Sequence, residues 1–188
     1  MPSDRYAVRR QKLLQQLRKS GVEVLLVTNF TNVTYLTGFS GDSSFLLIGP
    51  QILLLISDSR YTTQLSDECP TLDVHIRTNT QPILGEVGKV AKKAKLKQLG
   101  FESISTSFQQ WEQLQEEVKS VELQPLAGLI EELRMIKDAS EIGEIREAVR
   151  QAERGFAMLR SSLIGEMSEL EAAHDLEHSM RRFGAKAA

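Results

Sequence analysis

Two histidines near the end of this 188-residue chain have the spacing of a metal site. His174 and His178 enclose Glu177 in the order His-x-x-Glu-His. On a helix, positions four residues apart share a face, so both imidazoles would reach one zinc ion and Glu177 would polarise a bound water. A catalytic zinc normally takes a third protein ligand, and only ten residues follow His178. We therefore interpret both histidines as surface residues, and a small zinc hydrolase remains the alternative.

A second group of reactive side chains is the segment Asp58-Ser-Arg-Tyr61, which follows an apolar run. The end of a strand is a common position for binding residues in α/β sheets. We expect Arg60 and Tyr61 to contact substrate, because an arginine binds a carboxylate through two parallel hydrogen bonds. The alternative, which we favour, is that Asp58 caps the following helix while Arg60 forms a structural ion pair.

Other polar and aromatic features have weaker chemical implications. The segment Gly38-Phe-Ser-Gly41 lacks the spacing and the lysine of a phosphate-binding loop, so it predicts a tight turn. Phe108 and Trp111 share the expected core face of a helix and are interpreted as packing residues. Cys69 is the only cysteine, which excludes an intramolecular disulfide and fits a reducing compartment.

Composition narrows the class of protein. The chain is 41% hydrophobic and 26% charged, with a net charge of -2, so no overall positive field would attract nucleic acid or anionic lipid. The N-terminus has no long apolar stretch, and we expect a cytoplasmic protein without a membrane span. Two basic clusters are interpreted as solvated helix faces. They comprise Arg5, Arg9, Arg10 and Lys12, and Lys89, Lys92, Lys93, Lys95 and Lys97.

Strand-like and helix-like segments alternate up to about residue 125. Apolar runs predict strands at 22–27, 44–48, 52–56, 72–76, 99–101 and 121–123, and helical spacing predicts helices at 4–19, 31–37, 61–68, 82–97 and 107–118. The connection Gly49-Pro50-Gln51 is so short that its flanking strands must form an antiparallel hairpin. The pattern predicts an α/β fold with a layered mixed sheet flanked by helices.

The chain changes character after residue 125 and becomes wholly helical. We predict a helix at 129–134 and a longer one that begins at Ser140 as its N-cap. A third helix begins at Ser168, where Glu171 completes a capping box, and continues to about Phe183. The sequence thus predicts two domains, 1–125 and 126–188.

Five segments in this order resemble the Xaa-Pro metallopeptidases, which are the aminopeptidase P and prolidase relatives. They are Asn32-Val-Thr-Tyr-Leu-Thr-Gly-Phe-Ser-Gly41 with the hairpin after it, Asp58-Ser-Arg-Tyr61, Gly100-Phe-Glu102, Leu133-Arg-Met-Ile-Lys-Asp-Ala-Ser-Glu-Ile142, and Gly165-Glu-Met-Ser-Glu-Leu-Glu-Ala-Ala173 with Met180-Arg-Arg-Phe-Gly184. The resemblance extends from about residue 13 to residue 188. It implies a creatinase-like N-terminal domain followed by the first helices of a pita-bread catalytic domain.

The resemblance also implies where the chemistry of the family lies. In such enzymes two divalent metal ions (Mn, Co or Zn) are held by two aspartates, a histidine and two glutamates, all beyond the part that this sequence resembles. We therefore assign no catalytic residue and no metal ligand to this chain, and we expect it to be inactive alone, as a truncated piece of a longer hydrolase.

The expected role follows from the same resemblance. The longer protein would cut the bond before proline in peptides and would form a homo-oligomer, while this region would position substrate or mediate subunit contacts. The alternative is a protein-binding module from a relative without peptidase activity.

Overall fold

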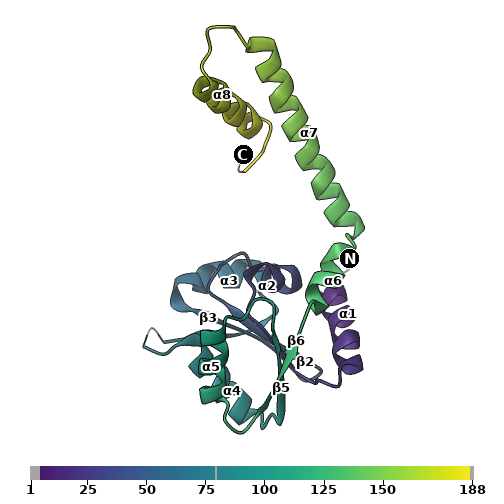
Figure 1. Ribbon diagram of the computed structural model, residues 1–188, viewed down its shortest axis with the longest axis vertical. Helices are drawn as coiled ribbons and strands as arrows, with labels where there is room; N and C mark the ends of the chain where they lie inside the picture. The colour runs from purple at the N-terminus through teal and green to yellow at the C-terminus, as the bar shows by residue number, and fades with distance from the viewer. Residues whose placement is uncertain (1–4, 79, 187–188) are drawn as a thin grey trace. The chain divides into compact units, whose positions relative to one another are not determined.

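The structure, a computed structural model, describes residues 5–78 and 80–186 (Figure 1). Contacts between Cα atoms divide the chain into two units, Met1–Met135 and Ile136–Ala188. This division comes later in the chain than the boundary predicted near residue 125, because the helix Leu129–Met135 packs Ile130 into the core of the first unit.

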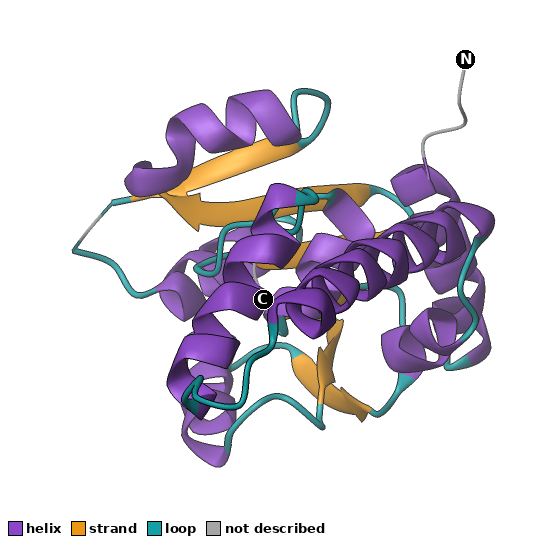
Figure 2. Ribbon diagram, turned by 90° about the horizontal axis from the view of Figure 1, so that it is seen from above, coloured by secondary structure: helices purple, strands orange, loops and turns teal. Residues whose placement is uncertain are grey.

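A six-stranded sheet forms the centre of the first unit, with its strands in orange in Figure 2. The strands are β1 Leu25–Val27, β2 Phe45–Gly49, β3 Ile52–Asp58, β4 Asp73–Arg77, β5 Gln98–Glu102 and β6 Glu122–Leu126. Their order across the sheet is β4-β3-β2-β1-β5-β6. β2 is antiparallel to β1 and to β3, and the remaining neighbours are parallel. The predicted α/β class with a mixed sheet and a β2–β3 hairpin is confirmed.

Successive residues of the central strands point to opposite faces of the sheet, as strand geometry requires, and build two cores. Leu25 and Val27 belong to one core, and Leu26 belongs to the other. The first core is covered by α1 Arg5–Lys19, α2 Phe30–Thr37, α3 Thr62–Glu68 and α6 Leu129–Met135. The second is covered by α4 Ile83–Lys93 and α5 Phe108–Glu117, which lie side by side in Figure 1.

The turn after α2 explains the spacing of Tyr-Leu-Thr-Gly-Phe in the sequence. Gly38 ends the helix with a φ of 85°, and a Cβ atom there would lie 2.7 Å from Cζ of Tyr6. The Thr37 hydroxyl donates to the carbonyl of Val33 at 2.7 Å and accepts from the backbone N–H of Phe39 at 3.0 Å. This part of the motif therefore fixes the backbone that leads into the loop before β2.

Several local predictions differ from the structure, and β1 begins at Leu25 in place of the predicted Val22. α4 ends at Lys93, before the predicted Lys97, because Lys95 adopts a φ of 53° and breaks the helical path. The long helix α7 takes Asp138 as its N-cap in place of Ser140, because the Asp138 carboxylate accepts from the backbone of Glu141. Phe108 is 71% exposed at the first turn of α5 and packs on the ring of Trp111, with their centroids 5.6 Å apart.

The second unit is a helical hairpin of α7 Ala139–Ser162 and α8 Glu169–Arg182. The helices approach closely at Gly155, where an added Cβ atom would lie 2.7 Å from Cγ of Met180. The guanidinium carbon of Arg154 lies 4.3 Å from the ring centroid of Phe183. Ser168 forms the predicted capping box with Glu171.

The contact between α4 and α5 makes a testable prediction about two glycines one turn apart. A Cβ atom at Gly88 would lie 2.9 Å from the backbone oxygen of Glu117, whereas one at Gly85 would lie 3.5 Å from its nearest neighbour. Gly88→Ala should therefore lower the free energy of unfolding by about 1–3 kcal/mol, because the two helices must separate. Gly85→Ala, the matched control, should leave it unchanged or raise it by up to about 1 kcal/mol.

Fluorescence of Trp111, the only tryptophan, reports on the first unit during urea unfolding. Equal effects of the two substitutions would contradict the close helix contact.

Candidate functional site

Five strands of the sheet end at the same edge. β2 is antiparallel to both of its neighbours and every other pair is parallel, so β1, β3, β4, β5 and β6 point the same way. In α/β sheets, ligands bind outside this carboxyl edge. Two buried carboxylates lie there, Asp58 at the end of β3 and Glu102 at the end of β5.

The first carboxylate, Asp58, is 2% exposed and organises two arginines. Its Oδ1 accepts from the backbone N–H of Arg60 at 3.0 Å, which caps the short helix η1 Ser59–Tyr61. The Arg60 side chain binds both carboxylate oxygens, with Nε at 3.0 Å from Oδ1 and Nη2 at 2.7 Å from Oδ2. Nη2 of Arg77 lies 3.4 Å from Oδ2. Hydrogen bonds from the Arg60 side chain hold the pKa of Asp58 below its ordinary value.

The geometry at Asp58 matches the alternative interpretation drawn from the sequence, a helix cap that also forms an ion pair. The Arg60 side chain nevertheless remains 67% exposed. Its Nη2 also donates to the Ser43 hydroxyl at 3.2 Å, whereas Nη1 has no hydrogen-bond partner within the described residues. One edge of a rigidly held guanidinium is therefore open to solvent.

Tyr61 and the loop before β2 surround this guanidinium. The Tyr61 ring centroid lies 5.4 Å from the guanidinium carbon of Arg60, and the ring packs edge-on against Phe39 at 5.5 Å. The Tyr61 hydroxyl donates to the carboxylate of Asp42, which lowers the pKa of Asp42 and raises the pKa of Tyr61. We call the four residues Asp42, Ser43, Arg60 and Tyr61 the Arg60 surface.

The loop that carries half of this surface is tied to α3. Ser40 donates to Glu68 through its backbone N–H and through its hydroxyl, each at 2.8 Å. Gln64 donates to the Ser40 hydroxyl, also at 2.8 Å. These bonds hold Ser40 against α3, and the Gly38 turn fixes the backbone just before it. The backbone that leads to Asp42 and Ser43 is therefore held at two points.

The second carboxylate, Glu102, collects donors from the start of α2. It accepts from the backbone N–H groups of Thr28 at 2.6 Å and Asn29 at 2.8 Å, and from Nδ2 of Asn32 at 2.6 Å. Burial raises the pKa of Glu102, and the donors from Asn29, Asn32 and Thr28 oppose that shift. A carboxyl group at this depth is tolerated because its oxygens are hydrogen-bonded.

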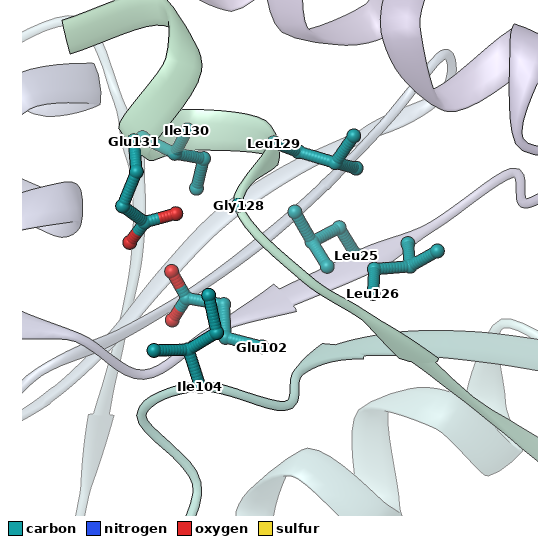
Figure 3. Close-up of a pocket in the computed structure, with 8 residues that line it drawn as sticks. All are labelled: Leu25, Glu102, Ile104, Leu126, Gly128, Leu129, Ile130 and Glu131. Carbon is teal, nitrogen blue, oxygen red and sulfur yellow. The ribbon is translucent and has the colours of Figure 1, made fainter. Parts of the chain in front are cut away.

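Asn32 extends this network to α6. Its Nδ2 also donates to Glu131 at 2.6 Å, and its Oδ1 accepts from Nη1 of Arg134 at 3.0 Å. Figure 3 shows the carboxylates of Glu102 and Glu131 turned toward one another. The cavity that they line has a volume of about 10 Å³, room for no more than a single water. The network therefore joins β5, α2 and α6 and does not form a ligand pocket.

The structure brings together residues that are far apart in sequence. Substrate contact by Arg60 and Tyr61 stays a prediction, and Asp42 and Ser43, which complete their surroundings, were missed. Asn32 and Glu102 appeared in separate motifs, and their contact depends on the parallel pairing of β1 with β5. The available signal was the position of Asn32 four residues before Leu36, on the same face of the helix, and of Glu102 at the end of a buried strand.

The histidine pair lies on α8, and the side chains of both His174 and His178 are exposed. Across residues 5–78 and 80–186, no group of three or more histidine, cysteine, aspartate or glutamate side chains is placed to hold a metal ion. The described residues thus do not fit a two-metal centre, and we assign no metal-dependent step to them. No helix in the same residues is both long and apolar enough to cross a membrane.

Known proteins match this chain over most of its length. The model of the creatinase/prolidase N-terminal domain matches residues 9–136. The uncharacterized peptidase YqhT of Bacillus subtilis (strain 168) is 29% identical over 175 residues, which are 93% of this chain and 49% of that protein. The chain thus spans about half the length of that relative.

Solved structures give the same pattern. An Xaa-Pro dipeptidase from Bacillus anthracis is 28% identical with a TM-score of 0.87, and the match covers 97% of this chain and 50% of that one. The N-terminal domain of the cytoplasmic peptidase PepQ from Mycobacterium tuberculosis H37Rv is 32% identical with a TM-score of 0.63. That match covers 67% of this chain and 98% of the solved domain.

The buried position of Asp58 predicts a pH-dependent loss of stability in Asp58→Asn. The variant should lose about 2–3 kcal/mol of unfolding free energy at neutral pH, because Arg60 and Arg77 lose a charged acceptor. A lowered pKa means that the contribution is present above the ordinary value of 3.8 and is lost as pH falls through the folded-state pKa. The difference in unfolding free energy between wild type and variant should therefore shrink as pH falls below 3.8.

Urea unfolding followed by Trp111 fluorescence measures this difference. Asp73→Asn, at an exposed position of β4, is the control and should stay within about 0.5 kcal/mol of wild type. An equal loss of unfolding free energy at every pH would show that the negative charge of Asp58 does not contribute to stability.

Proposed function

Because the chain belongs to the creatinase/prolidase N-terminal domain family, we propose that it is the non-catalytic accessory region of a metal-dependent Xaa-Pro peptidase. In this proposal the first unit positions proline-containing peptides for a catalytic domain that supplies the metal ions. The family match over residues 9–136 supports the assignment. The peptidase names of the relatives, of which this chain spans about half, support the substrate class.

The observation that carries the positioning role is the open edge of the Arg60 guanidinium. Asp58 holds the guanidinium by side-chain bonds of 2.7–3.2 Å, so little side-chain entropy would be lost when a ligand binds. An arginine that keeps a free N–H donor is suited to a carboxylate, such as the free C-terminus of a short peptide. Tyr61 beside it offers an apolar ring to the neighbouring residue of that peptide.

The chain's own residues would bind and orient in this proposal and would transfer no proton. Arg60 stays cationic, since its pKa is raised further by the Asp58 carboxylate. The nearby Asp42 stays anionic because the hydrogen bond from Tyr61 stabilises its charged form.

The proposal predicts different results for two proteins in one assay of Xaa-Pro dipeptide hydrolysis with added manganese or cobalt. The 188-residue chain should show no activity above the metal blank. The product of the reading frame that continues past codon 188 should be active, and Arg60→Ala there should raise KM on the order of tenfold with little change in kcat. Arg150→Ala, at a similarly exposed arginine with an acidic partner, is the matched control.

Hydrolysis by the 188-residue chain would refute its non-catalytic assignment. An unchanged KM in Arg60→Ala would refute the positioning role. A downstream frame that lacks the two aspartates, the histidine and the two glutamates would favour the protein-binding module.

A further inference from the structure

A long groove runs along the opposite, amino edge of the sheet. One hollow of about 800 Å³ lies between the segment before β1, the β2–β3 turn and the α4–β5 connection. A second of about 330 Å³ continues from it toward the end of α1. The two share Gly21, Glu23 and Pro50 in their linings, so they form one surface, which we call the amino-edge groove. The first hollow alone has the volume of a ligand site.

Charge in this groove is unevenly distributed. Lys95 and Lys97 line one end and Arg18 lines the other, whereas Glu23 is the one carboxylate in the two linings. All four side chains are exposed, and no ion pair in the described part of the chain involves any of the three cations. The linings also contain apolar side chains, of which Leu14, Ile52 and Leu96 are partly exposed and Leu17 and Val24 are buried.

The backbone at Lys95 is unusual for a lysine. Its φ is 53°, while the other described residues with positive φ are glycines. The backbone N–H of Leu96 binds the carbonyl of Ala91 at 3.0 Å, and that of Lys95 binds the carbonyl of Lys92 at 3.1 Å. This is the helix ending at which glycine is most common, because a Cβ atom is disfavoured there. A cationic side chain at a position that suits glycine indicates a role for the side chain itself.

The helix dipole explains only part of the basic cluster formed by Lys89, Lys92, Lys93, Lys95 and Lys97. Lys92 and Lys93 lie in the last turn of α4, where positive charge is favourable. Lys95 and Lys97 come after the helix and line the groove. The interpretation of the whole cluster as a solvated helix face therefore does not extend to these two residues.

We propose that the amino-edge groove binds an acidic segment of a partner protein. The occupant is an extended stretch in which aspartates or glutamates flank apolar anchors. Its acidic ends meet Lys95 and Lys97 on one side and Arg18 on the other, and its apolar anchors lie over the partly exposed Ile52 and Leu14. This site is separate from the Arg60 surface and does not depend on a peptidase function.

The test uses a short fluorescein-labelled peptide in which glutamates flank two leucines. The 188-residue chain should bind it saturably in fluorescence anisotropy, and binding should weaken as salt is raised. A peptide with lysines in place of the glutamates should not bind. Lys95→Gly should weaken binding about fivefold or more, because it removes one charged contact.

The same substitution separates binding from structure. Lys95→Gly should leave the Tm unchanged or raise it, because glycine suits the positive φ. Lys119→Gly removes the same charge from an exposed turn outside the groove lining and should bind the peptide like wild type. The proposal predicts that Lys95→Gly lowers affinity without lowering stability, a combination that a purely structural lysine cannot give.

Three results would overturn the proposal. They are no saturable binding of the acidic peptide, equal affinity of wild type and Lys95→Gly, and a lower Tm for Lys95→Gly. A single-stranded oligonucleotide that competes more strongly than the acidic peptide would assign the groove to nucleic acid.

Discussion

The carboxyl edge of the sheet depends on the hydrogen bonds that the Glu102 side chain accepts. A buried carboxyl group is costly unless donors surround it, and here the backbone of Thr28 and Asn29 and the amide of Asn32 provide them. These donors belong to the end of β1 and the start of α2, so the parallel pairing of β1 with β5 and the entry into α2 are fixed together. α2 then leads to the Gly38 turn and the loop that carries Asp42 and Ser43.

The two buried carboxylates of this edge have different consequences. Glu102 is bound by neutral donors, and Asn32, which donates to both Glu102 and Glu131, links β5 to α2 and α6. Asp58 is paired with Arg60, whose guanidinium it orients toward solvent. We propose that Glu102 gives the edge its shape and that Asp58, through Arg60, presents a cation to a substrate. The groove at the amino edge adds a second positively charged surface, built from Lys95 and Lys97.

Much of the fold could be predicted from the sequence because its signals are local. Apolar periodicity located the strands and helices, and the short Gly49-Pro50-Gln51 connection dictated the hairpin. Contacts that depend on the order of the strands in the sheet could not be predicted from local sequence patterns. The bond from Asn32 to Glu102 requires knowing that β5 lies beside β1, and the contact of Ser43 with Arg60 requires the register of β2 against β3. The N-cap at Asp138 was missed because Ser140 is an equally acceptable cap by residue type.

A double-mutant cycle on Asn32 and Glu102 tests most directly whether these motif residues build the edge. Asn32→Ala, Glu102→Ala and the double variant are compared with wild type by urea unfolding, followed through Trp111. If the bond between Asn32 and Glu102 holds the edge together, the coupling free energy between the two positions should be about 1–3 kcal/mol. Asn32→Ala combined with Glu86→Ala, which lies on α4 at the other face of the sheet, should be additive. Additive effects of Asn32→Ala and Glu102→Ala, within about 0.5 kcal/mol, would contradict the central role of their contact.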